Sequence, residues 1–196
     1  LEIGVYEIGD AGLKDIPNAS ELFLSERPVN ASGTVVVPVM EGTRPILVEV
    51  QALVGSSSYQ NARRTTNGID LNRLQLLLAV LEKRAGLLLG GSDAFVKVAG
   101  GVKIDEPAVD LGLAVALASS FRDCPVNPYT VIIGEVGLAG EVRAVSHMEQ
   151  RIRESRRMGF RRAIVPVSAE KVHTEPGFSL LGAPTLNDAL NMVMGR

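Results

Sequence analysis

Several residue types are scarce in this chain, and their scarcity limits the chemistry it can perform. Its 196 residues include no tryptophan, one cysteine (Cys124) and two histidines (His147 and His173). A single thiol cannot form an internal disulfide and is typical of a reducing compartment, so we predict a cytoplasmic protein in which Cys124 is a packing residue. Structural zinc sites use four cysteine or histidine ligands. The three such residues here fall short of that set, and no metal site is expected.

Long apolar segments and an excess of positive charge are also missing. The longest apolar run, Leu74 to Leu81, is interrupted by Gln75 and is shorter than the roughly 18 residues of a membrane-spanning helix. No charged and apolar leader opens the chain. We therefore expect no association with a membrane. The formal net charge of −2 argues against a uniformly basic nucleic-acid-binding protein, so any contact with DNA must come from local patches.

The order of the predicted segments favours an α+β fold over a regular βαβ repeat. Asp70 precedes leucines at helical spacing and Gly86 follows them, which predicts a helix between these two residues. A turn signal at 41–44 separates two strand-like segments, 34–40 and 45–54, and predicts a β-hairpin with Arg44 near its tip. Further strands are expected at 94–99, 130–133 and 163–167, and further helices at 109–120, 148–158 and 185–195. We expect Ser146 and Glu149 to form a capping box before the helix at 148–158. This order predicts a two-layer α+β domain.

Two segments resemble the active-site motifs of Lon-type serine peptidases. The segment Asp105-Glu106-Pro107-Ala108-Val109-Asp110 resembles the Asp-Gly-Pro-Ser-Ala-Gly stretch that carries the nucleophile, with Ala108 in the serine position. Residues 134–145 resemble the strand and turn before the catalytic lysine, and Glu149 stands in the lysine position. A Ser-Lys dyad requires both the hydroxyl and the amine. The resemblance therefore implies a Lon-like fold (ribosomal protein S5 domain 2-like) that is not catalytic.

Each of these substitutions also has an ordinary explanation when it is taken alone. A small residue such as Ala108 is common before a buried helix, and Glu149 would stabilise the first turn of a helix without any link to catalysis. The two substitutions together, each in a matching frame, favour a lost peptidase site.

Two further segments narrow the resemblance to one family. Residues 63–74 (Arg-Arg-Thr-Thr-Asn-Gly-Ile-Asp-Leu-Asn-Arg-Leu) and 3–8 (Ile-Gly-Val-Tyr-Glu-Ile) resemble the C-terminal part of the bacterial RadA (Sms) family. Members of that family join a zinc-binding segment, a RecA-like ATPase core and a Lon-like domain, and act as hexameric ring-shaped motors on DNA in recombination and repair. The resemblance implies that residues 1–26 are an exit strand and linker from the ATPase core and that 27–196 are the Lon-like domain. ATP, Mg²⁺ and Zn²⁺ would then be bound only by parts outside this chain, which contains no phosphate-binding Gly-x-x-x-x-Gly-Lys-Ser/Thr loop.

Five basic residues in predicted loops are the candidates for contact with DNA. Arg44, Lys103 and Arg143 each lie next to a glycine-bearing turn, and Arg63 and Arg64 precede the first long helix. Loop cations can reach phosphates at little desolvation cost, and a ring of identical subunits would multiply each contact. In a Lon-like fold, Lys103 and Arg143 would flank the former active site as neighbours. Because only 4% of the residues are aromatic, we expect contact with the duplex backbone rather than stacking with single-stranded bases.

Two other groups of charged residues allow more than one interpretation. Six arginines crowd the segment 151–162, where they form either a solvated helix face or a functional patch; they are Arg151, Arg153, Arg156, Arg157, Arg161 and Arg162. Asp105, Glu106 and Asp110 could attract Mg²⁺, but an acidic turn before a helix is also what capping and the helix dipole favour. We adopt the capping interpretation for these three carboxylates.

Three functions follow from these observations. The first is a non-catalytic domain of a DNA repair and recombination ATPase or helicase active in branch migration, which gives ring assembly and binds DNA without sequence preference. The second is a pure oligomerisation scaffold that does not touch DNA, which the acidic balance of charge supports. The third is an active serine peptidase that uses another serine, for which the matched frame provides no nucleophile.

Overall fold

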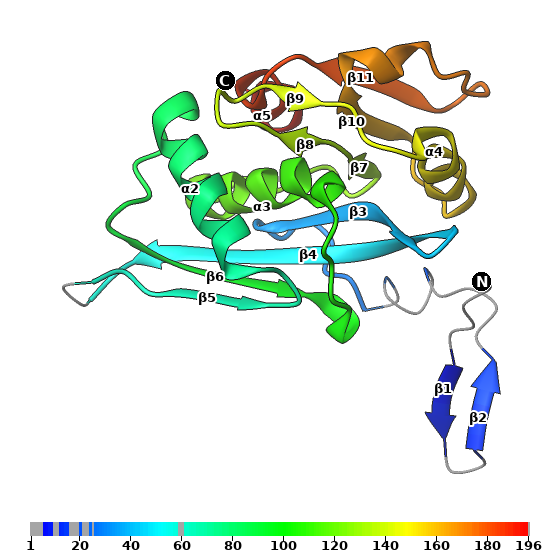
Figure 1. Ribbon diagram of the computed structural model, residues 1–196, viewed down its shortest axis with the longest axis horizontal. Coiled ribbons are helices and arrows are strands. Elements are labelled where there is room, and N and C mark those ends of the chain that lie inside the picture. The colour runs from blue at the N-terminus through cyan, green and yellow to red at the C-terminus, as the bar shows by residue number, and fades with distance from the viewer. Residues whose placement is uncertain are drawn as a thin grey trace.

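The fold is built around one seven-stranded mixed sheet (Figure 1). The computed structural model describes residues 6–9, 12–15, 20, 24, 26–58 and 61–195. The strand order is β11-β10-β7-β3-β4-β6-β5. β4 pairs antiparallel with both β3 and β6, and the other neighbours pair in parallel. The bounds of the strands in this sheet are β3 Thr34–Glu41, β4 Arg44–Ser56, β5 Arg64–Asn67, β6 Ser92–Val98, β7 Thr130–Ile132, β10 Arg162–Pro166 and β11 Ser179–Ala183.

Helices cover the sheet on both faces. Because successive side chains of a strand point to opposite faces, Val35 and Val37 of β3 join one apolar cluster and Val36 joins another. The larger cluster includes residues of α2 (Leu71–Ala85), α3 (Asp110–Arg122) and α5 (Leu186–Met194). The smaller cluster includes Ile152 of α4 (Met148–Arg157). The architecture is therefore compatible with the predicted α+β class, but the prediction of two layers was wrong, because α4 adds a layer on the second face of the sheet.

Two short hairpins and three 3₁₀ helices complete the described elements. β1 (Tyr6–Gly9) pairs antiparallel with β2 (Gly12–Asp15), and β8 (Glu135–Val136) with β9 (Val142–Arg143). The 3₁₀ helices are η1 (Ala99–Gly101), η2 (Pro107–Val109) and η3 (Val167–Lys171). No helix within the described ranges combines the length and the apolar character needed to cross a bilayer.

Local signals explain where α2 and α5 begin and where α2 ends. The Asp70 side chain accepts a hydrogen bond from the Arg73 amide at the start of α2, and Gly86 ends that helix in the left-handed conformation, as predicted. Thr185 caps α5 in the same way through the Asp188 amide. α3 is buried along most of its length, as its apolar sequence predicts. The predicted hairpin is confirmed, because β3 and β4 pair from Thr34 with Gln51 to Glu41 with Arg44.

One local prediction is wrong, two strands were not predicted, and the predicted linker stays untested. The expected capping box at Ser146 and Glu149 was wrong: the N-cap of α4 is His147, in the left-handed conformation and without a side-chain cap. The Ser146 carbonyl instead accepts a hydrogen bond from Arg151 Nε at 2.9 Å. β5 and β11 were not predicted, because four or five residues at the sheet edges carry little apolar pattern. The linker predicted within 1–26 lies largely outside the described residues, but Ser20 is 1% exposed and its hydroxyl accepts a hydrogen bond from the Leu47 amide at 3.0 Å.

Candidate nucleic-acid interface

The two motif segments lie side by side, at the start of α3. The Gly134 amide donates to the Ala108 carbonyl at 3.2 Å, and the Leu111 amide donates to the Gly134 carbonyl at 3.0 Å. Ala108 itself is 3% exposed, so its methyl group is part of the core. Glu149 is exposed on the first turn of α4 and lines a different groove, together with His173 and Glu175. The two positions that the sequence resemblance matches to a serine and a lysine therefore hold a buried methyl group and an exposed carboxylate, and neither side chain supplies the hydroxyl or the amine of a Ser-Lys dyad.

A buried arginine fills the space next to this frame. Arg151 is fully buried, and its Nη1 and Nη2 atoms donate to the two carboxylate oxygens of Glu106 at 2.9 and 2.5 Å. Nη1 also donates to the Pro38 carbonyl at 2.6 Å. Glu106 Oε1 accepts a second hydrogen bond from the Met40 amide at 2.8 Å. The expectation that Arg151 is either on a solvated face or in a surface patch is therefore wrong, because four hydrogen bonds to Glu106, Pro38 and Ser146 allow its charge to be buried.

A cleft of about 660 Å³ opens between α2, the start of α3 and the β8–β9 hairpin. Arg73 and Asp110 form an ion pair at this cleft, and the Val136 amide donates to Asp110 Oδ2 at 3.3 Å. Burial raises the pKa of Asp110 above its ordinary value, although Arg73 favours the ionised form. Arg143 lines the cleft with 61% of its side chain exposed, and Glu141 lies 4.0 Å from it. Arg143 is thus the predicted cation that lies at the cleft.

Arg44 and Lys103 lie beside two other turns. Arg44 is the first residue of β4 and is half-buried, opposite Glu41. Burial works against ionisation of Glu154, but hydrogen bonds from Arg157 and Ser20, helped by the charge of Arg44, lower the pKa of that carboxyl. Lys103 is exposed in the coil between η1 and η2 and does not line the cleft that holds Arg143. The sequence-based expectation that Lys103 and Arg143 are neighbours stays a prediction.

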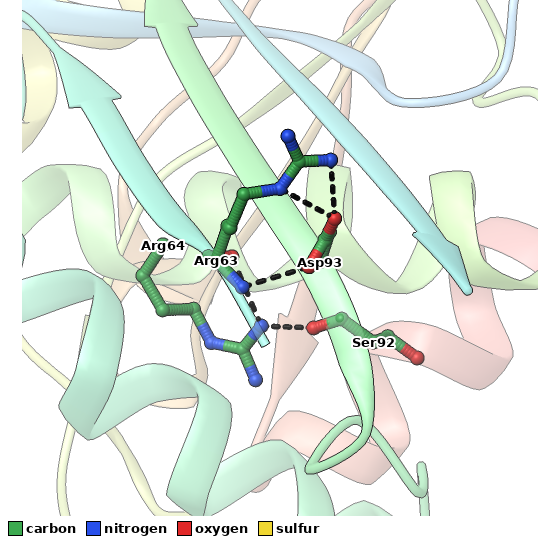
Figure 2. Close-up of polar contacts among 4 residues, drawn as sticks. All are labelled: Arg63, Arg64, Ser92 and Asp93. Atoms are coloured by element: carbon green, nitrogen blue, oxygen red, sulfur yellow. Dashed lines mark hydrogen bonds and ion pairs between the residues drawn. The ribbon is translucent and has the colours of Figure 1, made fainter. Parts of the chain in front are cut away.

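Arg63 and Arg64 are held by β6 and the loop before it (Figure 2). The Arg63 amide donates to Asp93 Oδ1 at 2.7 Å, and its Nε and Nη2 donate to Oδ2 at 2.8 and 2.6 Å. These bonds lower the pKa of Asp93. Arg64 donates to the carbonyls of Ser92 and Leu89, the latter at 3.0 Å. Arg64 therefore has a structural role at the start of β5, and Arg63 keeps about half of its side chain exposed beside a neutralising partner.

Most of the arginines after Arg151 have partners on the surface. Arg156 pairs with Glu175, and Arg157 donates to both carboxylate oxygens of Glu154 at 2.8 Å. The Arg161 guanidinium lies 5.0 Å from the centre of the Tyr129 ring, and Arg162 Nε donates to Thr130 Oγ1 at 2.7 Å. Their distribution favours a solvated, internally paired face.

The acidic turn has its own partners. Glu106 binds Arg151 and Asp110 binds Arg73, while Asp105 is exposed. Within the described ranges, no group of three histidine, cysteine or acidic side chains is arranged to hold a metal ion. The sequence did not indicate the arginine partners of these carboxylates. The partners are 37 and 45 positions apart in the sequence, and neither separation corresponds to a local spacing.

The sequence of this chain is similar to that of one family of known proteins. It is 50% identical over 196 residues to DNA repair protein RadA of Halalkalibacterium halodurans, covering all of this chain and 43% of the relative. The same protein of Bacillus subtilis is 51% identical over 195 residues (99% of this chain, 43% of the relative), and that of Streptococcus pneumoniae is 50% identical over 193 residues (98% and 46%).

The match to a family model is shorter than the matches to these relatives. A model described as subunit ChlI of Mg-chelatase matches residues 93–169, which include both motif segments. The chain spans less than half the length of the curated relatives described above. The resemblance expected from the motifs is confirmed: from end to end, this chain is similar to the C-terminal part of the RadA family of DNA repair proteins.

Proposed function

We propose that this chain is a non-catalytic Lon-like domain that serves a DNA repair and recombination ATPase of the RecA-like type. In this function it assembles as a hexameric ring and binds the DNA backbone without sequence preference. The observation that carries the proposal is the combination of two facts. The relatives that match the whole chain are named DNA repair proteins, and the serine position of the peptidase frame is the buried Ala108.

Three cations in or beside separate turns are the proposed contacts to DNA. Arg44 lies at the tip of the β3–β4 hairpin, Lys103 lies in the coil after η1, and Arg143 is at the rim of the cleft. Arg63 is a weaker candidate because Asp93 neutralises it, and Arg64 is weaker still because its guanidinium binds carbonyl groups. Phosphate contacts of this kind give affinities that fall steeply with salt and depend little on base sequence.

The test is the binding of this chain to a labelled duplex, measured by fluorescence anisotropy over a salt series. Replacing Arg44, Lys103 and Arg143 by Gln should lower the slope of log affinity against log salt by about 2.7, because each phosphate contact contributes about 0.9. The matched control replaces Arg153, Arg156 and Arg157 of α4 by Gln, which removes the same charge from another surface. Equal losses in both triple variants would show that net charge, rather than these turns, determines binding.

The alternative is a scaffold that holds the motors in a ring without contacting DNA. One surface feature favours it: Leu53 is 65% exposed and lines a groove of about 290 Å³ on β4 and β6, next to Phe95. Sedimentation that shows a stable hexamer, together with no duplex binding at low salt, would support the scaffold and reject the DNA-binding role.

A further inference from the structure

We propose that Glu106 and Arg151 form a positioning pair that holds the three DNA-contacting turns in one fixed arrangement; this inference rests on the function proposed above. Arg151 is the most deeply buried charged side chain among the described residues, and its partner Glu106 is 24% exposed. Neither side chain can reach a phosphate while it is engaged in this way. Its effect on DNA binding must therefore act through other residues.

The hydrogen bonds of the pair connect three segments that are distant in the sequence. Arg151 binds the Pro38 carbonyl at 2.6 Å, and Glu106 binds the Met40 amide at 2.8 Å, both at the end of β3. Glu106 belongs to the segment between η1 and η2. The Ser146 carbonyl, which accepts from Arg151 Nε at 2.9 Å, belongs to the segment between β9 and α4. One ion pair thus joins the hairpin end, the coil before α3 and the start of α4.

Each of these segments carries one of the proposed DNA contacts a few residues away. Arg44 follows Met40 by four positions across the hairpin tip, Lys103 precedes Glu106 by three, and Arg143 precedes Ser146 by three. A planar guanidinium with several donors fixes the relative orientation of the groups that it binds, which a flexible lysine amine does less well. Glu106 and Arg151 are therefore placed to set the spacing of the three cations without touching the DNA themselves.

The Glu106→Gln variant distinguishes positioning from a simple electrostatic effect, because the two predict opposite changes in the affinity for DNA. The variant removes one negative charge near the cations, so electrostatics alone predicts tighter binding. The variant also places an amide NH2 group opposite the Nη2 donor of Arg151, where two donors cannot form a hydrogen bond. The pair is therefore weakened, and positioning predicts weaker binding to DNA. We expect a loss of about eightfold in affinity for duplex DNA at 0.1 M salt for each phosphate contact that is lost, together with a smaller salt slope. Glu175→Gln is the matched control, since it removes the same charge from the exposed Arg156–Glu175 pair, and its affinity should not fall.

Two measurements distinguish a loss of positioning from a loss of folding and from a failure of the proposed function. Circular dichroism fixes a temperature at which the variant is fully folded, and binding is measured there. Hydrogen exchange should show faster exchange in 38–46, 101–107 and 141–147 together in Glu106→Gln, and not in Glu175→Gln. Faster exchange in one segment alone, or unchanged or tighter DNA binding by Glu106→Gln, would overturn the inference. Absence of DNA binding by the wild type would reject the proposed function, and the exchange data would still decide whether the pair joins the three turns.

Discussion

Replacing Arg151 by Met should destabilise the protein far more than replacing any exposed arginine of α4. Methionine matches the aliphatic part of the side chain but leaves the Pro38 and Ser146 carbonyls without their donor, and Glu106 without its partner. Breaking a buried ion pair costs about 3–5 kcal/mol. Glu106 is 24% exposed and keeps its bond from the Met40 amide, so water compensates part of its lost pairing and the lower end of the range applies.

The expected loss of unfolding free energy is therefore about 3 kcal/mol. For a domain of this size, this corresponds to a fall in Tm of about 6–12 °C, at about 2–4 °C per kcal/mol. Urea unfolding followed by circular dichroism measures the free energy directly, provided that the slope with urea is the same in wild type and variant. Arg156→Met is the control, since the side chains of Arg156 and Glu175 are 40% and 61% exposed and such pairs contribute less than about 1 kcal/mol. A similarly small loss for Arg151→Met would mean that water reaches the guanidinium and its carbonyl partners, which would refute the reasoning from burial.

Three other substitutions test the packing, the electrostatics and the capping of the fold. Gly112→Ala should cost about 1–3 kcal/mol in urea unfolding, because its Cβ would overlap Val37 Cγ1 in a filled core; Gly55→Ala, which meets no atom within 4 Å, should cost much less. Burial raises the pKa of Glu49 above 4.5, so the folded protein binds this proton more tightly than the unfolded chain, and stability is lost as pH rises through the folded pKa. Glu49→Gln should therefore be more stable than wild type at pH 7 and should flatten the stability profile above pH 4.5, as measured by urea unfolding between pH 4 and 8. Asp70→Ala should lower the unfolding free energy by about 1 kcal/mol through loss of the N-cap of α2, whereas Asp70→Ser should keep most of it.

The predicted elements were correct where several local signals agree, whereas the single capping-box pattern at Ser146 and Glu149 was not. The helix after Asp70 combines an N-cap, leucines at helical spacing and a C-terminal glycine, and the structure confirms all three. The hairpin ending at Arg44 combines strand-forming residues with a turn signal, and it is also confirmed. By contrast, β5 and β11 depend on pairing with β6 and β10, which are distant in the sequence or separated by a long connection. A short edge strand is defined by its neighbour more than by its own residues.

The positions of the candidate cations beside turns could be predicted from the sequence. The polar partners of the buried Arg151 could not. Arg44, Lys103 and Arg143 are adjacent to glycine-bearing turns in the sequence and in the structure. The sequence gives Arg151 the same appearance as Arg153, since both belong to one arginine-rich helix, yet Arg151 is buried and Arg153 exposed. The difference depends on whether a distant carboxylate meets the side chain, and helical spacing contains no information about that.

The acidic residues of the motif segment are the main difference between this chain and the peptidase stretch that the segment resembles. In the matched frame, Glu106 and Asp110 both stand where the peptidase segment has glycine. Glycine has no side chain, whereas each of these carboxylates forms an ion pair with an arginine: Glu106 with Arg151 and Asp110 with Arg73. Both arginines come from other helices, so the two ion pairs attach α4 and α2 to the start of α3. The carboxylates on either side of Ala108 thus have a structural role in this fold, because each one joins the start of α3 to another helix through a bonded arginine.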